Sequence, residues 1–134
     1  MQLKSAKELD VYQKAYGLAM RLFTLSRTFP LEERFALTSQ IRRSSRSICL
    51  NLREAGEAWA KRRYEAHFVS KLTDCDGENS ETDSSLDFAK DCGYITVQTH
   101  SELASLCCDI GKMLGSMIKD PKPFLILRSP TSDL

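Results

Sequence analysis

The stretch from Leu37 to Arg63 constrains the fold of this chain more than any other part of the sequence. It runs for 27 residues without a proline, and its apolar side chains recur at spacings of three, four and seven. The apolar positions of this seam are Leu37, Ile41, Ile48, Leu52, Ala55 and Trp59. Because an α-helix turns once in about 3.6 residues, this spacing predicts an amphipathic helix with one buried face.

Three other segments repeat the same pattern and have recognisable ends. The first ends at Phe29-Pro30, because the residue before a proline is disfavoured in the helical conformation. Gly93 fits the left-handed position that closes a helix. The seams and breaks predict four helices, over about residues 6–28, 31–60, 62–91 and 95–118.

Short connections between long helices favour one architecture. We expect an all-α, up-down-up-down antiparallel four-helix bundle in which residues 1–118 form a single domain. Residues 119–134 form a C-terminal tail that contains prolines. The apolar run Phe124–Leu127 in this tail could lie back on the bundle, add to a neighbouring molecule or remain loose.

A few positions on or near the seams are polar or lack a side chain. Asn51, Asn79 and Thr82 are expected to set the register between helices, because buried polar groups cost free energy unless they are hydrogen-bonded. Gly77 falls inside a predicted helix, where glycine costs up to about 1 kcal/mol relative to alanine. Close approach of another backbone would explain it.

Charge is distributed unevenly along the chain, although the net charge is only +1. Residues 1–71 hold 14 Lys or Arg against 7 Asp or Glu, whereas residues 72–134 hold 5 against 11. In an antiparallel bundle these halves can neutralise each other within the protomer. They can also leave one basic and one acidic face, which suits head-to-tail self-association or a charged partner.

The second predicted helix and its end carry the candidate site. The candidate nucleic-acid or subunit-interface residues are Arg42, Arg43, Arg46, Arg53, Arg62 and Arg63. A basic stripe can follow phosphates, but the overall charge is near neutral and no aromatic platform lies among these arginines in the sequence. The candidate acidic interface is Asp74, Asp76, Glu78 and Glu81. These carboxylates are either a solvated face or partners for arginines of a neighbouring subunit.

Motifs for catalysis or metal binding are missing from the sequence. Di-iron bundles use Glu-x-x-His, yet neither His67 nor His100 has a glutamate three residues before it. There is no Gly-x-Ser-x-Gly and no phosphate-binding glycine loop. We therefore expect no enzymatic activity and no cofactor. With five cysteines, no C-x-x-C, no signal peptide and no 18-residue apolar run, we expect a cytoplasmic protein without a membrane partner.

Several short blocks point to a known family. The matching blocks are Asp10–Ala15, Phe29-Pro30, Gln40–Arg43, Ser47-Ile48 with Asn51-Leu52 and Glu54, Glu81-Thr82, and Gly93–Ile95. Across about residues 8–118 the chain resembles the four-helix-bundle family named for proteins encoded in intervening sequences of 23S ribosomal RNA genes. The family's alanine and glycine after the asparagine are here Arg53 and Ala55.

This resemblance implies a bundle that assembles into a homopentameric ring, without demonstrated enzymatic activity for most members. A related branch, the accessory proteins of diversity-generating retroelements, forms a basic pentameric barrel that partners a reverse transcriptase and RNA. We therefore predict a non-enzymatic scaffold or adaptor that forms a homo-oligomeric ring, with itself as the first partner. The alternative is an RNA-binding or reverse-transcriptase accessory subunit that uses the basic face of the second helix on RNA or a ribonucleoprotein.

Overall fold

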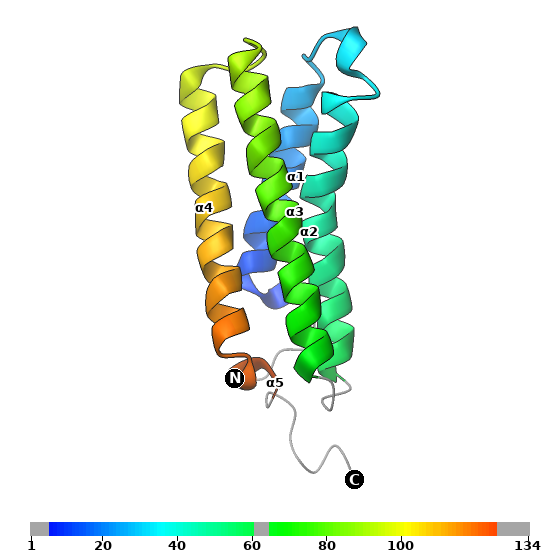
Figure 1. Ribbon diagram of the computed structural model, residues 1–134, viewed down its shortest axis with the longest axis vertical. Coiled ribbons are helices and arrows are strands. Elements are labelled where there is room, and N and C mark those ends of the chain that lie inside the picture. The colour runs from blue at the N-terminus through cyan, green and yellow to red at the C-terminus, as the bar shows by residue number, and fades with distance from the viewer. Residues whose placement is uncertain (1–5, 61–64, 126–134) are drawn as a thin grey trace.

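The computed structural model describes residues 6–60 and 65–125, and this part of the chain is an all-α bundle (Figure 1). Its four main helices are α1 (Asp10–Ser26), α2 (Leu37–Ala60), α3 (Glu65–Asp91) and α4 (Val97–Lys119). Three short elements accompany them: η1 (Ala6–Glu8), η2 (Leu31–Glu33) and α5 (Lys122–Leu125). The predicted four-helix bundle is confirmed.

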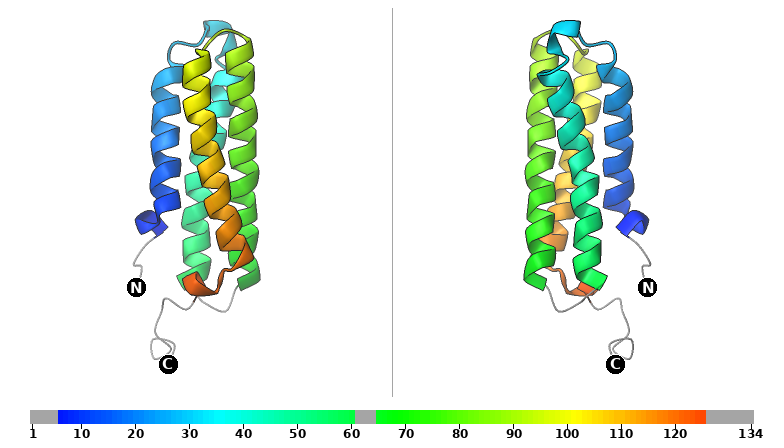
Figure 2. Two further views of the ribbon diagram at one scale, coloured as in Figure 1. Left: turned by 90° about the vertical axis from the view of Figure 1, so that its left-hand side faces the viewer. Right: turned by 90° about the vertical axis from the view of Figure 1, so that its right-hand side faces the viewer.

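Consecutive main helices run in opposite directions (Figures 1 and 2). α1 packs against α2 and α4, and α3 packs against the same two helices. The α1–α2 pair therefore forms one side of the bundle and the α3–α4 pair forms the opposite side. Among the described residues, no helix has the length and apolar character needed to cross a membrane.

The core lies between the four helices and follows the predicted seams. On α2, the side chains of Ile41, Ile48, Leu52 and Ala55 are at most 1% exposed. The other helices supply further fully buried side chains, namely Leu18, Leu22, Phe68, Leu72, Leu86, Leu103, Ile110 and Leu114. Each fully buried aliphatic or aromatic side chain contributes about 1.5–3 kcal/mol. Trp59, also assigned to the seam, lies outside the described side chains.

The α1–α2 connection differs from the prediction, because α2 begins at Leu37 rather than near residue 31. A carboxylate oxygen of Glu33 accepts a hydrogen bond from the Leu37 N–H (3.4 Å), and the other accepts one from the Tyr94 hydroxyl (2.8 Å). The Phe29 ring lies 5.5 Å from the Tyr94 ring. These contacts hold the connection against the α3–α4 connection at the same end of the bundle (Figure 1).

Two glycine predictions have opposite outcomes. Gly93 has φ +79°, and the next residue, Tyr94, donates its N–H to the carbonyl of Ala89 (2.8 Å), so the predicted helix closure is confirmed. At Gly77 the predicted close approach is wrong, because an added Cβ would have no atom within 4 Å. The close approach occurs at Gly56, where a Cβ would lie 3.0 Å from the Cβ of Ala6.

Candidate interaction faces

The first candidate contact joins the predicted basic and acidic sets within one chain. Arg43 on α2 lies between two carboxylates of α3, with Nη1 3.6 Å from Glu78 and Nη2 3.1 Å from Glu81. A second ion pair between the same helices joins Lys71 to Glu54 (2.6 Å). The Arg43 side chain is 59% exposed, so each of its pairs contributes no more than about 1 kcal/mol.

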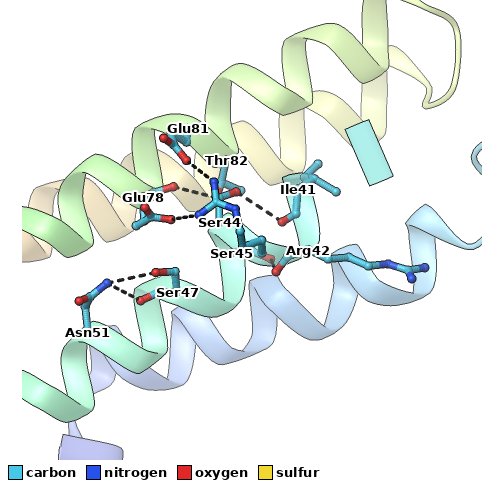
Figure 3. Close-up of polar contacts among 10 residues, drawn as sticks. Ile41, Arg42, Ser44, Ser45, Ser47, Asn51, Glu78, Glu81 and Thr82 are labelled. Carbon is cyan, nitrogen blue, oxygen red and sulfur yellow. Dashed lines mark hydrogen bonds and ion pairs between the residues drawn. The ribbon is translucent and has the colours of Figure 1, made fainter. Parts of the chain in front are cut away.

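A polar groove of about 400 Å³ lies beside this contact, between α2 and α3. It is lined by Asn51, Thr73, Asp74, Gly77, Glu78 and Glu81. The Asn51 amide donates to the carbonyl (3.0 Å) and hydroxyl (3.1 Å) of Ser47, one turn back on its own helix (Figure 3). These bonds join no second helix, so a register role for Asn51 stays a prediction.

Thr82 and Asn79, the other two predicted register residues, do make buried polar contacts between helices. The Ser44 and Thr82 hydroxyls lie 2.8 Å apart between α2 and α3, and both side chains are fully buried. Asn79 Nδ2 donates to the Cys107 carbonyl (2.9 Å) on α4, while its Oδ1 has no hydrogen-bond partner among the described residues. Sequence reasoning selected Thr82 and Asn79 but missed Ser44, although Ser44 lies between Ile41 and Ile48 on the seam.

Three arginines gather around one aromatic ring on the other side of α2. The guanidinium carbons of Arg27, Arg42 and Arg46 lie 4.8, 4.9 and 5.6 Å from the centre of the Phe23 ring. Arg42 also donates from Nε to the Ser26 hydroxyl (2.7 Å) and is directed away from the carboxylates of α3 (Figure 3). Among the described residues, none of these three arginines forms an ion pair with a carboxylate.

The Phe23 cluster corrects one sequence argument. The sequence places no aromatic side chain among the arginines of α2, but the fold brings Phe23 to them from α1. A guanidinium over an aromatic ring contributes about 0.5–1 kcal/mol at an exposed position. The missing signal was tertiary, because 19 residues separate Phe23 from Arg42 in the chain.

Exposed apolar side chains continue this surface along both helices. Tyr16 and Met20 lie about two turns and one turn before Phe23 on α1, and they are 53% and 49% exposed. Leu50 lies one turn after Arg46 on α2 and is 63% exposed. Since α1 and α2 are antiparallel, both sets extend in the same direction. The arginine–aromatic face is defined as Tyr16, Met20, Phe23, Arg27, Arg42, Arg46, Leu50 and Arg53.

The opposite side of the bundle carries carboxylates. Asp76, Asp83 and Asp87 lie on one stripe of α3 next to α4, and His100 Nε2 lies 2.7 Å from Asp87 Oδ1. Burial raises the pKa of Asp83, the charge of Asp87 raises it further, and His100 opposes the rise. Gly111 lies near Asp76, whose Oδ1 would be 4.0 Å from an added Cβ. The acidic face is defined as Asp76, Asp83, Asp87, His100 and Gly111.

The remaining candidates are distributed as follows. Arg53 is exposed and forms no ion pair within the described residues, whereas Arg62 and Arg63 lie outside them. A carboxylate oxygen of Asp74 lies 3.9 Å from the amino group of Lys71, in the preceding turn of the same helix. Asp83 and Asp87 were not among the four acidic interface candidates, although they share the stripe of Asp76.

The described residues offer little for chemistry at a metal or a thiolate. No group of three His, Cys, Asp or Glu side chains among them could hold a metal ion. Burial raises the pKa of the Cys49 thiol to about 11 and the pKa of the Cys75 and Cys107 thiols to about 12. These three thiols are therefore protonated at neutral pH and are poor nucleophiles.

The helix order and packing define an antiparallel four-helix bundle with one arginine-rich and one acidic side. The chain belongs to the 23S rRNA-intervening sequence protein family, whose model matches residues 7–116. A crystal structure at 1.70 Å of a protein with unknown function from the S23 ribosomal protein family of Bacteroides thetaiotaomicron VPI-5482 is similar, with 32% identity and a TM-score of 0.72. The similarity covers 81% of this chain and 95% of that chain. No curated protein matches the chain significantly.

Proposed function

We propose that this protein is a non-enzymatic scaffold or adaptor that assembles into a homo-oligomeric ring. The observation that carries the proposal is the arginine–aromatic face. Tyrosine, phenylalanine, methionine and arginine are enriched at protein interfaces, and Tyr16 and Met20 are about half exposed here. Scattered apolar side chains are normal on a surface, but these adjoin each other and three arginines.

The arrangement of the faces supports a ring. The arginine–aromatic face lies on the α1–α2 side, and the acidic face lies on the α3–α4 side. A contact between two different faces is heterologous, and such contacts generate a closed ring when the rotation between copies closes. The resemblance to the family implies five copies.

Light scattering coupled to gel filtration tests the assembly. The expected mass at micromolar concentration is five times the 15.2 kDa of one chain. A monomeric mass over the whole accessible concentration range would refute the proposal.

The alternative function is that of an RNA-binding or reverse-transcriptase accessory subunit. The Phe23 cluster favours it, because proteins that bind single strands combine cationic side chains with aromatic rings. RNA binding would weaken steeply with salt as counterions are released. Gel shifts would compare the protein with a Phe23→Leu variant. A complete lack of a complex at low salt, with RNA and with a candidate polymerase, would exclude this alternative.

A further inference from the structure

We propose that the arginine–aromatic face of one copy binds the acidic face of the next copy, head to tail. This inference rests on the proposed ring and adds to it the two surfaces that meet. The occupant of the arginine–aromatic face is then a second copy of this chain.

Within the part of the chain that the structure describes, little opposite charge lies next to either face. Helix α3 contains eight acidic and two basic residues. The α3 carboxylates that face α2, Glu78 and Glu81, lie beside Arg43, whereas in the acidic face Asp87 lies 2.7 Å from His100. On the other side, Arg27 and Arg46 lie on Phe23 without a carboxylate among the described residues. Opposite charges on two surfaces steer association and fix its register.

The shapes of the faces are also complementary. The arginine–aromatic face presents long side chains. Helix α4 presents small residues beside the acidic stripe, because Ala104, Gly111 and Gly115 follow His100 on the same side of the helix at spacings of four, seven and four. The backbone is therefore accessible there, so long arginine and tyrosine side chains of another copy can pack close to it.

Asp83 occupies a position that is unfavourable in a single copy. It is half-buried between Asp87 on its own helix and the His100 and Cys107 side chains of α4. Burial and the charge of Asp87 raise its pKa, which means that its ionised form is destabilised by folding. A guanidinium group from another copy would stabilise the ionised carboxylate by a charge-assisted, two-pronged hydrogen bond.

Charge reversal tests the contact. Arg46→Glu and Asp83→Arg each place like charges across the proposed interface, so each should raise the dissociation constant of the assembly at least about tenfold. The double variant restores opposite charges at every interface of a head-to-tail ring, so it should recover most of the assembly. Arg34→Glu is the matched control, because Arg34 is exposed in the α1–α2 connection, outside both faces. Circular dichroism checks that each variant is folded.

Asp83→Asn is a second test, because asparagine is about as large as aspartate and does not require space for a larger side chain at this position. It should weaken the assembly of the otherwise unchanged chain and raise the melting temperature of the Arg46→Glu protomer. If Asp83 has only a structural role, Asp83→Asn should either weaken the assembly and lower the melting temperature, or strengthen the assembly and raise the melting temperature. Either of these results would overturn the proposal.

The outcomes separate this contact from the ring itself. A wild-type monomer refutes the proposed function. A wild-type ring whose mass and dissociation constant are unchanged by Arg46→Glu and Asp83→Asn refutes this contact and leaves the ring standing. If Arg46→Glu abolishes RNA binding and leaves the ring intact, the face belongs to nucleic acid and the proposal is wrong.

Discussion

The buried hydroxyl pair between α2 and α3 gives an unequal prediction for its two members. Each hydroxyl has one proton to donate. We assign the Thr82 proton to the carbonyl of Glu78, at 2.9 Å, because the opposite assignment would leave Ser44 to donate to the carbonyl of Ile41 at 3.5 Å; in the contact of 2.8 Å, Ser44 is then the donor and Thr82 the acceptor. Removing the acceptor should therefore cost more than removing the donor.

Thr82→Val keeps the shape of the side chain but removes the acceptor of the buried Ser44 hydroxyl. The nearest remaining acceptor among the described residues is the carbonyl of Ile41, at 3.5 Å, which is too far for a good hydrogen bond. An unsatisfied buried donor costs about 2 kcal/mol. Ser44→Ala leaves no such donor, and we expect a loss of about 1 kcal/mol. The double variant replaces both polar groups by apolar ones and should lose less than Thr82→Val does by itself.

Urea unfolding at a fixed protomer concentration measures these differences, because the proposed assembly would make stability depend on concentration. With a urea m value of about 1.5 kcal/mol per molar, Thr82→Val should lower the midpoint by roughly 1.3 M. Thr73→Val is the matched control, because the Thr73 hydroxyl is exposed and bonds to its own helix (2.9 Å). The assignment of donor and acceptor is wrong if Ser44→Ala lowers the free energy of unfolding more than Thr82→Val does. It is also wrong if the double variant loses the sum of the free energies that the two single variants lose.

Glycine geometry and thiol burial determine how four other perturbations should act. Gly77→Ala should raise the free energy of unfolding by about 1 kcal/mol, because Gly77 is helical and an added Cβ would have no atom within 4 Å. Gly93→Ala should lower the free energy of unfolding by roughly 1–2 kcal/mol, because the φ angle of Gly93 is +79°. Urea unfolding measures both changes. At pH 8 a thiol reagent should modify exposed Cys92 and Cys108 far faster than the three buried cysteines, as mass spectrometry can show. Burial raises the pKa values of these three thiols from 9.0 to about 11–12. The stability that the buried thiols contribute is therefore complete below pH 9 and is lost as the pH rises toward 11–12. Urea midpoints that do not fall across this pH range would contradict the prediction.

The parts of the fold that depend on local geometry were predictable. Ile41, Ile48 and Leu52 are buried because the period of an α-helix places them on one side, whatever lies opposite. The left-handed Gly93 follows from a restriction on a single residue, and Phe29-Pro30 sets a limit that α1 does not reach, because it ends at Ser26.

Features set by distant residues were not predictable. The start of α2 depends on Glu33, whose carboxylate bonds with Tyr94, 61 residues further along the chain. Gly77 was assigned a close approach because a helical glycine needs a reason, but the sequence does not show which glycine another segment approaches. The answer, Gly56, depends on where η1 crosses α2.

The arginines show the same limit within one helix. Adjacent residues of an α-helix point about 100° apart. Arg42 therefore reaches Ser26 on α1, while Arg43 reaches Glu81 on α3. The sequence predicts the angle between these two side chains, but only the packing decides which helix each one meets.

The charge that remains available on the surface is decided by the order of the helices rather than by the net charge. A net charge of +1 counts against a basic binding surface when it is spread over the whole chain. Here eight of the 18 carboxylates belong to α3, while the acidic residue of α1 is Asp10 at its first position. Arg43 of α2 faces α3 and lies beside two carboxylates, whereas Arg42 and Arg46 face α1 and form no ion pair within the described residues. A nearly neutral protein thereby keeps one cationic and one anionic side, which is the arrangement that a head-to-tail contact between copies requires.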